Sequence, residues 1–299
     1  MRHLSTTLLG KSIQTAAKLR GGGSALPGLV VEKIDPNFIK RTLDKLPHGV
    51  VVISGTNGKT TTTKMVVELL EGQGLRVFTN RTGSNFVRGV AAALLEAVNL
   101  KGALEADIAV LELDEAHAVH FVRVIPPKYS LLLNVMRDQL DRFGEIDTTA
   151  KLLETTAHAT TEKVIINRED PRLVAIAASL PKDKVNYFGL GQSARSNFPN
   201  DDNLHGGASQ KIKRPEAISI LEKLDGKTGD FTLLDHTFSC QLALDGIYNV
   251  FNASAALGLV ASIVSPLDIP KLKETLAEVT PAFARGETVV VNGQPLELV

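Results

Sequence analysis

The sequence has a single cysteine, few aromatic residues and no tryptophan. The lone Cys240 excludes an intrachain disulfide and any zinc site built from several cysteines, so we expect no bound zinc and a reducing compartment such as the cytoplasm. No apolar run approaches the roughly 18 to 20 residues that cross a bilayer. The segment "LSTTLLG" near the start is too short and too polar for a secretory signal. These absences predict a chain that is neither secreted nor inserted in a membrane.

An excess of charge of either sign is also missing, because 33 basic residues balance 33 acidic ones. Without clustered Lys and Arg, nothing favours nucleic acid as a partner. The N-terminus departs from this balance: residues 1–31 contain no acidic side chain, and their basic residues are Arg2, Lys11, Lys18 and Arg20. We expect residues 1–45 to form a basic helical leader with a glycine hinge at "GGG". Its partner is expected to be an anionic surface such as the inner membrane face, or another subunit, and a transit peptide is the alternative.

What the chain has instead is a regular alternation of short aliphatic runs and longer amphipathic stretches, starting at residue 46. The runs are "GVVVIS", "RVFTN", "DIAVLEL", "KYSLLLNV" and "EKVIIN". This alternation is typical of a mostly parallel α/β sheet flanked by helices. The length of 299 residues and the hydrophobic content of 43% allow one large or two modest globular domains.

The alternation stops in a polar stretch at residues 189–215, which we expect to be a flexible loop. Beyond it, "FTLLDHTFSCQLALDG" predicts a small antiparallel element that packs on the main sheet, and "YNVFNASAALGLVASIV" and "DIPKLKETLAEV" predict helices. The end, "RGETVVVNGQPLELV", predicts a hairpin with "NG" in its turn. Because the chain stops inside such a strand, we expect further sequence to be missing.

The stretch "SGTNGKTTTT", residues 54–63, follows an apolar strand and precedes an amphipathic helix. It departs from the Walker A spacing, because only two residues separate Gly55 from Gly58. The parts of a phosphate site are nonetheless present: the N–H groups of a glycine turn, a helix N-terminus, Lys59 for the β- and γ-phosphates, and the Thr60 hydroxyl for Mg²⁺. A plain turn is the alternative. The predicted phosphate-binding residues are Gly55, Thr56, Asn57, Gly58, Lys59, Thr60 and Thr61.

The letters "GTNGKTTTT" resemble the nucleotide loop of the Mur ligase superfamily, ATP-dependent enzymes that activate a carboxylate as an acyl phosphate and then form an amide. The resemblance implies that ATP and Mg²⁺ are the cofactors. It also implies a P-loop-type central ATP-binding domain over residues 46–299, with a mostly parallel sheet, and a chain from which the C-terminal ligase domain is absent.

Acidic residues close the predicted strand "DIAVLELDEAH". Because side chains alternate along a strand, Glu112 and Asp114 lie on the same side, at the carboxyl end where α/β sheets bind ligands. The resemblance implies that Glu112 binds the metal together with Thr60, with Asp114 and Glu115 as its neighbours at the site. A capping or salt-bridged acid cluster is the alternative.

Residues 134–151, "NVMRDQLDRFGEIDTTAK", resemble a superfamily segment in which a His stands where this chain has Gln139. A neutral amide binds a hard cation more weakly, so we expect a weaker second Mg²⁺ site. Lys151 matches the lysine that many Mur ligases carry as a carbamate, which places it beside Lys59 and Glu112 in the implied catalytic set. A plain lysine on a helix surface is the alternative.

Asparagine residues follow or open further predicted elements. Asn167 and Asp170 come just after the strand "EKVIIN", and Asn249 and Asn252 lie three apart at a helix start, so both pairs can face one site. Amide groups can read adenine by a paired donor and acceptor. The resemblance implies that Asn249 and Asn252 border the adenine, with N-capping by Asn249 as the alternative. In "FARGE" it implies that Arg285 contacts the nucleotide phosphates, and a solvent-exposed arginine is the alternative.

Three segments resemble the MurT branch of the superfamily, the ligase-like subunits of lipid II isoglutaminyl synthase. They are "GGGSALPGLVVEKIDPNFIKRTLDKLPHGVVVISGTNGKTTTTK", "LELDEA" and "RDQLDRFGE". The resemblance implies ATP-dependent amidation of the D-glutamate α-carboxylate of the peptidoglycan stem in lipid II, with ammonia from a GatD-like glutamine amidotransferase partner. The chain departs from the branch in lacking its four-cysteine zinc ribbon, at residues 189–215, and its C-terminal domain. A non-catalytic Mg-ATP-binding remnant and a Mur-type amino acid ligase are the alternatives.

Overall fold

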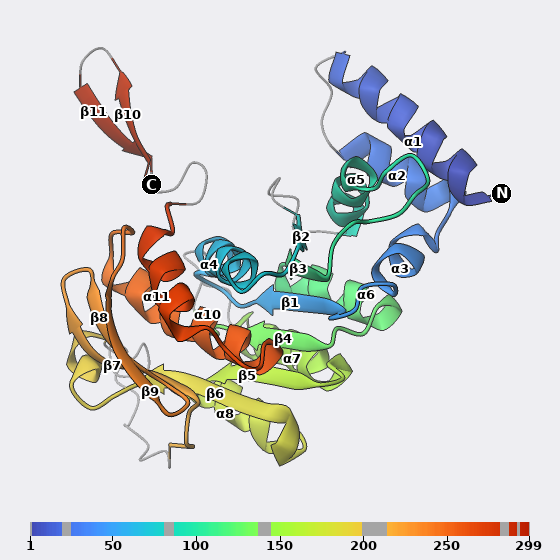
Figure 1. The fold of residues 1–299 in the computed structure, drawn as a ribbon. Helices are drawn as coiled ribbons and strands as arrows, with labels where there is room; N and C mark the ends of the chain where they lie inside the picture. The colour runs from blue at the N-terminus through green and yellow to red at the C-terminus, as the bar shows by residue number, and fades with distance from the viewer. Residues whose placement is uncertain are drawn as a thin grey trace.

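The computed structural model describes residues 2–19, 25–80, 87–136, 145–198, 214–281, 287–291 and 294–298. Within these ranges, nine strands form one sheet in the order β2-β3-β1-β4-β5-β6-β7-β8-β9 (Figure 1). Neighbouring strands from β2 to β7 run parallel, and β7, β8 and β9 pair antiparallel. The strands are β1 Val50–Ser54, β2 Val77–Thr79, β3 Ile108–Glu112, β4 Tyr129–Leu132, β5 Lys163–Asn167, β6 Val185–Leu190, β7 Ser219–Asp225, β8 Thr228–Leu233 and β9 His236–Gln241.

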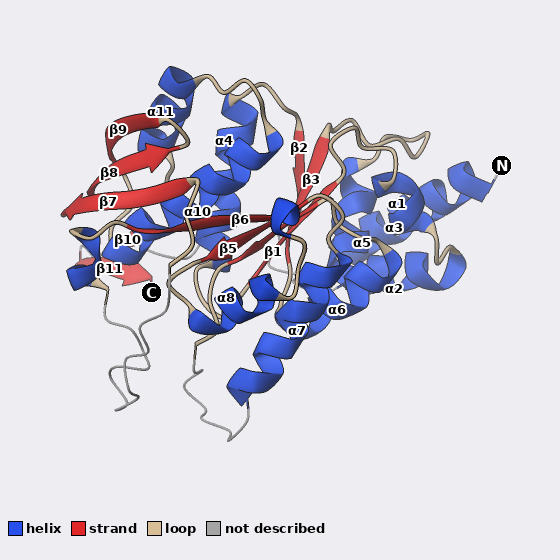
Figure 2. Cartoon of the chain, turned by 90° about the horizontal axis from the view of Figure 1, so that it is seen from below, coloured by secondary structure: helices blue, strands red, loops and turns tan. Residues whose placement is uncertain are grey.

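Helices cover both faces of this sheet (Figure 2). The helices in the described ranges are α1 Arg2–Leu19, α2 Ala25–Ile34, α3 Phe38–Leu43, α4 Lys59–Gly72, α5 Val87–Ala97, α6 Glu115–Val124, α7 Glu145–Ala159, α8 Pro171–Ala178, α10 Ile247–Ile263 and α11 Ile269–Glu278. Of these, α1 packs on α2 and α5 rather than on the sheet. Two short 3₁₀ helices, η1 Lys182–Lys184 and η2 Ala194–Asn197, flank β6.

The central strands are buried from both sides, which is why they read as continuous apolar runs rather than as an alternation. In β1, Val51 and Ile53 pack into one core with α4, α10 and α11. Val50 and Val52 point the other way and pack with α2, α3, α5 and α6. A third core joins α7 and α8 to β4 and β5. Figure 1 shows α4, α10 and α11 side by side on their face of the sheet.

This architecture confirms the predicted class, a mostly parallel α/β sheet flanked by helices with a small antiparallel element. The five aliphatic runs form β1 to β5, and the predicted hairpin is β8 with β9, to which β7 adds a third strand. The prediction that this element packs on the main sheet is wrong, because β7 pairs with β6 and the antiparallel strands extend the same sheet at its edge. The final predicted hairpin is also present, as β10 Glu287–Val291 paired with β11 Gln294–Leu298. The predicted loop at 189–215 begins later than expected, because Gly189 and Leu190 belong to β6 and Ala194–Asn197 form η2. Its residues 199–213 and the "NG" turn of the final hairpin lie outside the described residues.

The predicted leader contains α1, α2 and α3, and the "GGG" hinge lies outside the described residues. Val31, Phe38 and Leu43 are buried in the same core as α5 and α6. Arg41 donates hydrogen bonds of 3.2 and 2.6 Å to Asp35, and this pairing lowers the pKa of the Asp35 carboxyl. No helix in the described ranges is long and apolar enough to cross a membrane. Contact of the leader with a membrane or a subunit, and the division into domains, stay predictions.

Strand register decides which chain segments meet at the carboxyl edge of the sheet. Ile53 of β1 pairs with Glu112 of β3, and Ser54 pairs with Leu132 of β4. The residues that follow these three strands therefore converge, at the edge where open α/β sheets bind ligands.

Candidate functional site

The loop between β1 and α4 is shaped by two glycines with positive φ. Gly55 has φ of 136° and Gly58 has φ of 85°, backbone conformations that side chains disfavour. A Cβ at residue 58 would lie 2.9 Å from Asn252 Oδ1, so the Asn252 side chain would have to move to accommodate it. Gly58 is the N-cap of α4 and offers no side-chain cap. The first N–H groups of α4 therefore lack a side-chain acceptor, which suits an anion.

Lys59 opens α4 and folds back over this loop. Its Nζ donates hydrogen bonds of 2.6 Å to the Gly55 carbonyl and 3.2 Å to the Thr56 carbonyl. Asp114 Oδ1 lies 3.5 Å and Glu115 Oε1 lies 4.0 Å from the same nitrogen. Only 14% of the Lys59 side chain is exposed. Its ammonium group therefore lies between the carbonyls of the loop and the carboxylates of Asp114 and Glu115.

The Thr60 hydroxyl, on the first turn of α4, contacts the Glu112 carboxylate at the end of β3. Thr60 Oγ1 donates a 2.8 Å hydrogen bond to Glu112 Oε1, and Glu112 is buried. The backbone of Glu112 is itself fixed by Asn80, which accepts from its N–H at 3.0 Å and donates to its carbonyl at 2.8 Å. Asn80 follows β2, so three neighbouring elements position this carboxylate.

This pair has the chemistry that magnesium prefers. Hydroxyl and carboxylate oxygens are hard ligands, and Mg²⁺ is usually held by one or two carboxylates with waters and substrate phosphates rather than by a cage of protein groups. Within the described ranges, no cluster of three His, Cys, Asp or Glu side chains could hold a metal ion. Thr60 and Glu112 would therefore be the protein's share of a site that phosphate and water complete.

Asn134 holds the middle of the loop. Its Oδ1 accepts from the Asn57 N–H at 2.9 Å, and its Nδ2 donates to the Asn57 carbonyl at 3.0 Å. The Thr56 N–H donates to the Asn134 carbonyl at 3.1 Å, and the Met136 N–H donates to Thr56 Oγ1 at 3.1 Å. The segment after β4 thus lies beside the phosphate loop over several residues.

Asn167 and Asp170, predicted to face the site, bind backbone instead. Asn167 Nδ2 donates to the Leu133 carbonyl at 2.9 Å, and Asp170 accepts from the Val135 N–H at 2.7 Å. Asp170 also caps α8 by accepting from the Arg172 N–H at 2.9 Å. Burial raises the pKa of the Asp170 carboxyl, and the backbone donors around it oppose that rise.

The two asparagines of α10 differ in their surroundings. Asn252 lies against Gly58, so the start of α10 borders the phosphate loop. Asn249 Nδ2 donates to the Asp245 carbonyl at 2.5 Å. The N-cap of α10 is Gly246, so the alternative that Asn249 caps the helix is wrong. Adenine recognition by either residue stays a prediction.

The remaining predicted residues are not joined to this cluster. Thr61 lies on the first turn of α4, and Lys151 is exposed on α7, where its side chain makes no hydrogen bond or ion pair with another described residue. Gln139 and Arg285 lie outside the described residues. The roles predicted for these four residues stay predictions.

Sequence reasoning assigned no role to Asn80 or Asn134, although both contact the predicted site. Each is a polar residue directly after or close to the end of an aliphatic run, the signal that identified Glu112. The sequence does not give the order of the strands in the sheet. Only that order shows that β2 is adjacent to β3 and that β4 lies beside β1.

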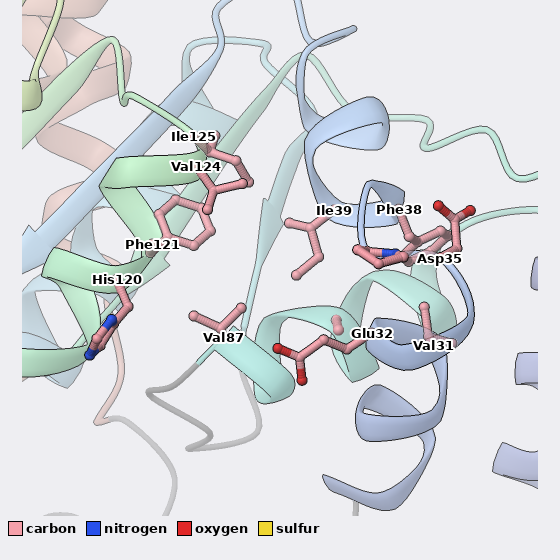
Figure 3. Close-up of a pocket in the computed structure, with 12 residues that line it drawn as sticks. Val31, Glu32, Asp35, Phe38, Ile39, Val87, His120, Phe121, Val124 and Ile125 are labelled. Atoms are coloured by element: carbon pink, nitrogen blue, oxygen red, sulfur yellow. The ribbon is translucent and has the colours of Figure 1, made fainter.

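A separate pocket lies among the helices of the N-terminal half. Its volume is about 140 Å³, and Figure 3 shows Val87, Ile39 and Phe121 around the same space, with Glu32 and His120 at its border. These side chains come from α2, α3, α5 and α6. The pocket shares no lining residue with the phosphate loop, so the two features are independent.

Comparison with known proteins assigns a family to this arrangement. Residues 53–260 match the Mur ligase middle domain. The chain is 29% identical over 328 aligned positions to the lipid II isoglutaminyl synthase (glutamine-hydrolyzing) subunit MurT of Streptococcus pneumoniae, a match that covers 99% of this chain and 71% of that protein. It is also 29% identical to the subunit of the same name from Staphylococcus aureus strain COL, over 64% of this chain and 42% of the relative.

Solved structures show the same fold. A crystal structure of MurF from Acinetobacter baumannii superimposes with a TM-score of 0.68 at 17% identity, over 90% of this chain and 54% of that one. The MurF ligase of Thermotoga maritima in complex with ADP gives 0.64 at 18% identity, over 91% and 57%. The chain therefore spans about half the length of these two ligases and less than half of the S. aureus relative.

Proposed function

This chain belongs to the Mur ligase family, and we propose that it uses Mg-ATP to convert a carboxylate into an amide through an acyl phosphate. The observation that carries the proposal is the 2.8 Å hydrogen bond between Thr60 and Glu112, beside Lys59 at the N-terminus of α4. A hydroxyl, a carboxylate and an ammonium group thus lie together at one end of α4. The ammonium group and the helix N-terminus suit phosphate, and the hydroxyl and carboxylate oxygens suit Mg²⁺.

For the substrate, we propose the D-glutamate α-carboxylate of the peptidoglycan stem in lipid II. The support is the match over 99% of the chain to a relative named lipid II isoglutaminyl synthase subunit. That name also says glutamine-hydrolyzing, so we propose a GatD-like glutamine amidotransferase as the partner that supplies ammonia.

In this proposal the residues of the loop bind and orient the nucleotide. The N–H groups at the start of α4 and the Lys59 ammonium bind the β- and γ-phosphates, and Thr60 and Glu112 would hold Mg²⁺. Bound Mg²⁺ neutralises phosphate charge. The substrate carboxylate oxygen then bonds to the γ-phosphorus as the bond to ADP breaks. Ammonia attacks the acyl carbon, phosphate leaves, and the nitrogen loses a proton to solvent. Arg285 and Lys151 are further proposed contributors.

A second candidate keeps the acyl phosphate but uses an amino acid as the nucleophile. Its support is the 27% identity, over 72% of this chain, to the UDP-N-acetylmuramoylalanine–D-glutamate ligase of Bordetella pertussis. The two candidates share the phosphate loop and differ in the nucleophile that displaces phosphate. The relative's name also indicates a different carboxylate substrate, UDP-N-acetylmuramoylalanine.

One experiment separates them. The purified chain is incubated with Mg-ATP and either lipid II or UDP-N-acetylmuramoylalanine, each in parallel with ammonium or with a mixture of amino acids, and products are identified by mass spectrometry. Free ammonium makes the partner unnecessary. A carboxamide formed only with ammonium supports the amidation proposal, whereas an amino acid adduct supports the second candidate. Absence of both products with a chain that binds Mg-ATP would contradict the amidation proposal for this chain and support the alternative of a non-catalytic Mg-ATP-binding remnant.

A further inference from the structure

The backbone from Leu133 to Met136, which we call the strap, lies between the phosphate loop and the junction of β5 with α8. It directly follows β4. On the loop side, Asn134 pairs with both backbone groups of Asn57, at 2.9 and 3.0 Å, and its carbonyl accepts from the Thr56 N–H. A side-chain amide presents a carbonyl acceptor and an N–H donor side by side, which matches the N–H and carbonyl of one residue, so this contact resembles a strand bridge made by a side chain.

On its other side, the strap is held by two buried polar residues. The Val135 N–H donates to Asp170 Oδ2 at 2.7 Å, and Asn167 donates to the Leu133 carbonyl at 2.9 Å. Asp170 divides its oxygens between two tasks, because Oδ1 accepts from Arg172 N and Leu173 N to cap α8. Both Asn167 and Asp170 are buried. The strap is therefore fixed from the interior of the protein.

We propose that the strap sets the conformation of the phosphate loop, with Asn134 as the positioning residue for nucleotide binding and Asp170 holding the strap from behind. This inference rests on the proposed function, because it takes the loop to be the nucleotide site. Its physical basis is preorganisation. The loop carries two glycines with positive φ, and Asn57 between them is exposed. A glycine loop without lateral bonds has many backbone states, and each must be given up when phosphate binds.

In this proposal the strap keeps its position when nucleotide binds to the phosphate loop. The side chains of Asn167 and Asp170, which hydrogen-bond to the strap, are buried. Breaking either of these hydrogen bonds is costly, because it leaves a buried polar group without a partner. Through the strap, the loop is therefore attached to the buried end of β5. Lys59 contributes from inside the loop, since it binds the Gly55 and Thr56 carbonyls.

The test compares Asn134→Ala, Asn134→Asp and Asp170→Asn with the wild type and with a control, Asn186→Ala. The control removes an asparagine of β6 whose side chain donates to Ser262, away from the loop. Mg-ATP affinity is measured by calorimetry near neutral pH. We expect about tenfold weaker binding for Asn134→Ala, from the loss of two hydrogen bonds, and unchanged binding for the control. Equal affinity for Asn134→Ala and wild type overturns the proposal.

Asn134→Asp supplies a readout that simple loss of packing would not move. Near neutral pH its carboxylate can accept from the Asn57 N–H but faces the Asn57 carbonyl without a donor. At about pH 4, near the ordinary pKa of aspartic acid, the neutral acid again offers one donor and one acceptor. We expect its affinity, divided by that of the wild type at the same pH, to recover at the lower pH, while Asn134→Ala stays weak. Identical ratios for the two variants at both pH values contradict the proposal.

Asp170→Asn keeps an N-cap oxygen for α8 but turns an amide toward the Val135 N–H, so it detaches the strap without uncapping the helix. We expect several-fold weaker Mg-ATP binding. Hydrogen exchange at the Asn57 amide, measured without nucleotide, tests the strap alone: protection in the wild type is expected to be lost in Asn134→Ala. If wild type binds no nucleotide and this protection is lost in Asn134→Ala, the proposed function fails, while the part of the proposal that the strap sets the loop conformation stands. If protection is unchanged, the strap proposal fails.

Discussion

Thr60 Oγ1 and Glu112 Oε1 lie 2.8 Å apart, a hydrogen bond that joins the first turn of α4 to the last residue of β3. The two residues are 52 positions apart in the sequence and become neighbours because β1 pairs with β3 in parallel register. The strand pairing, rather than any local motif, thus creates the proposed Mg²⁺ site.

Glu112→Gln tests this relationship while conserving shape. The amide oxygen can still accept from Thr60, but the negative charge is lost. We expect the concentration of Mg²⁺ that half-saturates ATP turnover to rise about 10- to 100-fold. The matched control is Glu115→Gln, in the same acidic cluster and 4.0 Å from Lys59, for which a small change is expected. An unchanged Mg²⁺ requirement in Glu112→Gln would mean that this carboxylate does not serve the metal.

Gly58→Ala tests the need for space at the loop. Its φ of 85° and the nearby Asn252 both oppose a Cβ. Gly74 is the matched control, because it has φ of 88° and no atom lies within 4 Å of the position that a Cβ would take there. Both alanine variants are expected to lose about 1 kcal/mol of unfolding free energy from left-handed backbone strain, measured in urea. Only Gly58→Ala is expected to lose Mg-ATP affinity, and equal affinities in the two variants would refute the steric argument.

Asp107 gives a prediction for acid stability. Arg76 holds its carboxylate through hydrogen bonds of 3.1 and 2.7 Å from the guanidinium and 2.8 Å from its backbone N–H, and these bonds lower the pKa of Asp107 from 3.8 to about 2. A carboxyl whose pKa is lower in the folded state stabilises the fold above its unfolded pKa. That stabilisation is lost as pH falls from 3.8 toward about 2.

The variant Asp107→Asn has no such ionisation. Urea unfolding at a series of pH values is therefore expected to show wild type more stable than Asp107→Asn at neutral pH, with the difference shrinking below 3.8. A difference that is constant across this range would show that the ion pair with Arg76 has no linked proton.

The sequence was sufficient for the elements that local pattern determines. Short aliphatic runs alternating with amphipathic stretches predicted β1 to β5, and the glycines around Lys59 predicted a phosphate loop. It was not sufficient for contacts that depend on strand order. Asn134 and Asn80 stand at strand ends like many asparagines. Asn134 reaches the loop only because β4 lies beside β1, and Asn80 reaches Glu112 only because β2 lies beside β3.

Burial explains a second group of differences. Asn167 and Asp170 were expected to face the site because they follow a strand, but the backbone of Leu133 and Val135 lies between them and the loop and takes up their polar atoms. Unpaired N–H groups of a buried segment need acceptors, and a carboxylate at a helix N-cap is well placed to supply one. Periodicity alone does not tell a polar residue that meets a ligand from one that meets a backbone.

The most direct test of the account is calorimetric titration of Mg-ATP into the wild-type chain, into Lys59→Ala and into Lys64→Ala. Lys64 lies on the same helix, and its Nζ binds Thr280 and the Pro281 carbonyl instead of the loop. We predict binding by wild type and by Lys64→Ala and no measurable binding by Lys59→Ala, because the loop and its lysine act as one phosphate site. Equal affinity in wild type and Lys59→Ala would contradict the assignment of residues 55–60 as the nucleotide site.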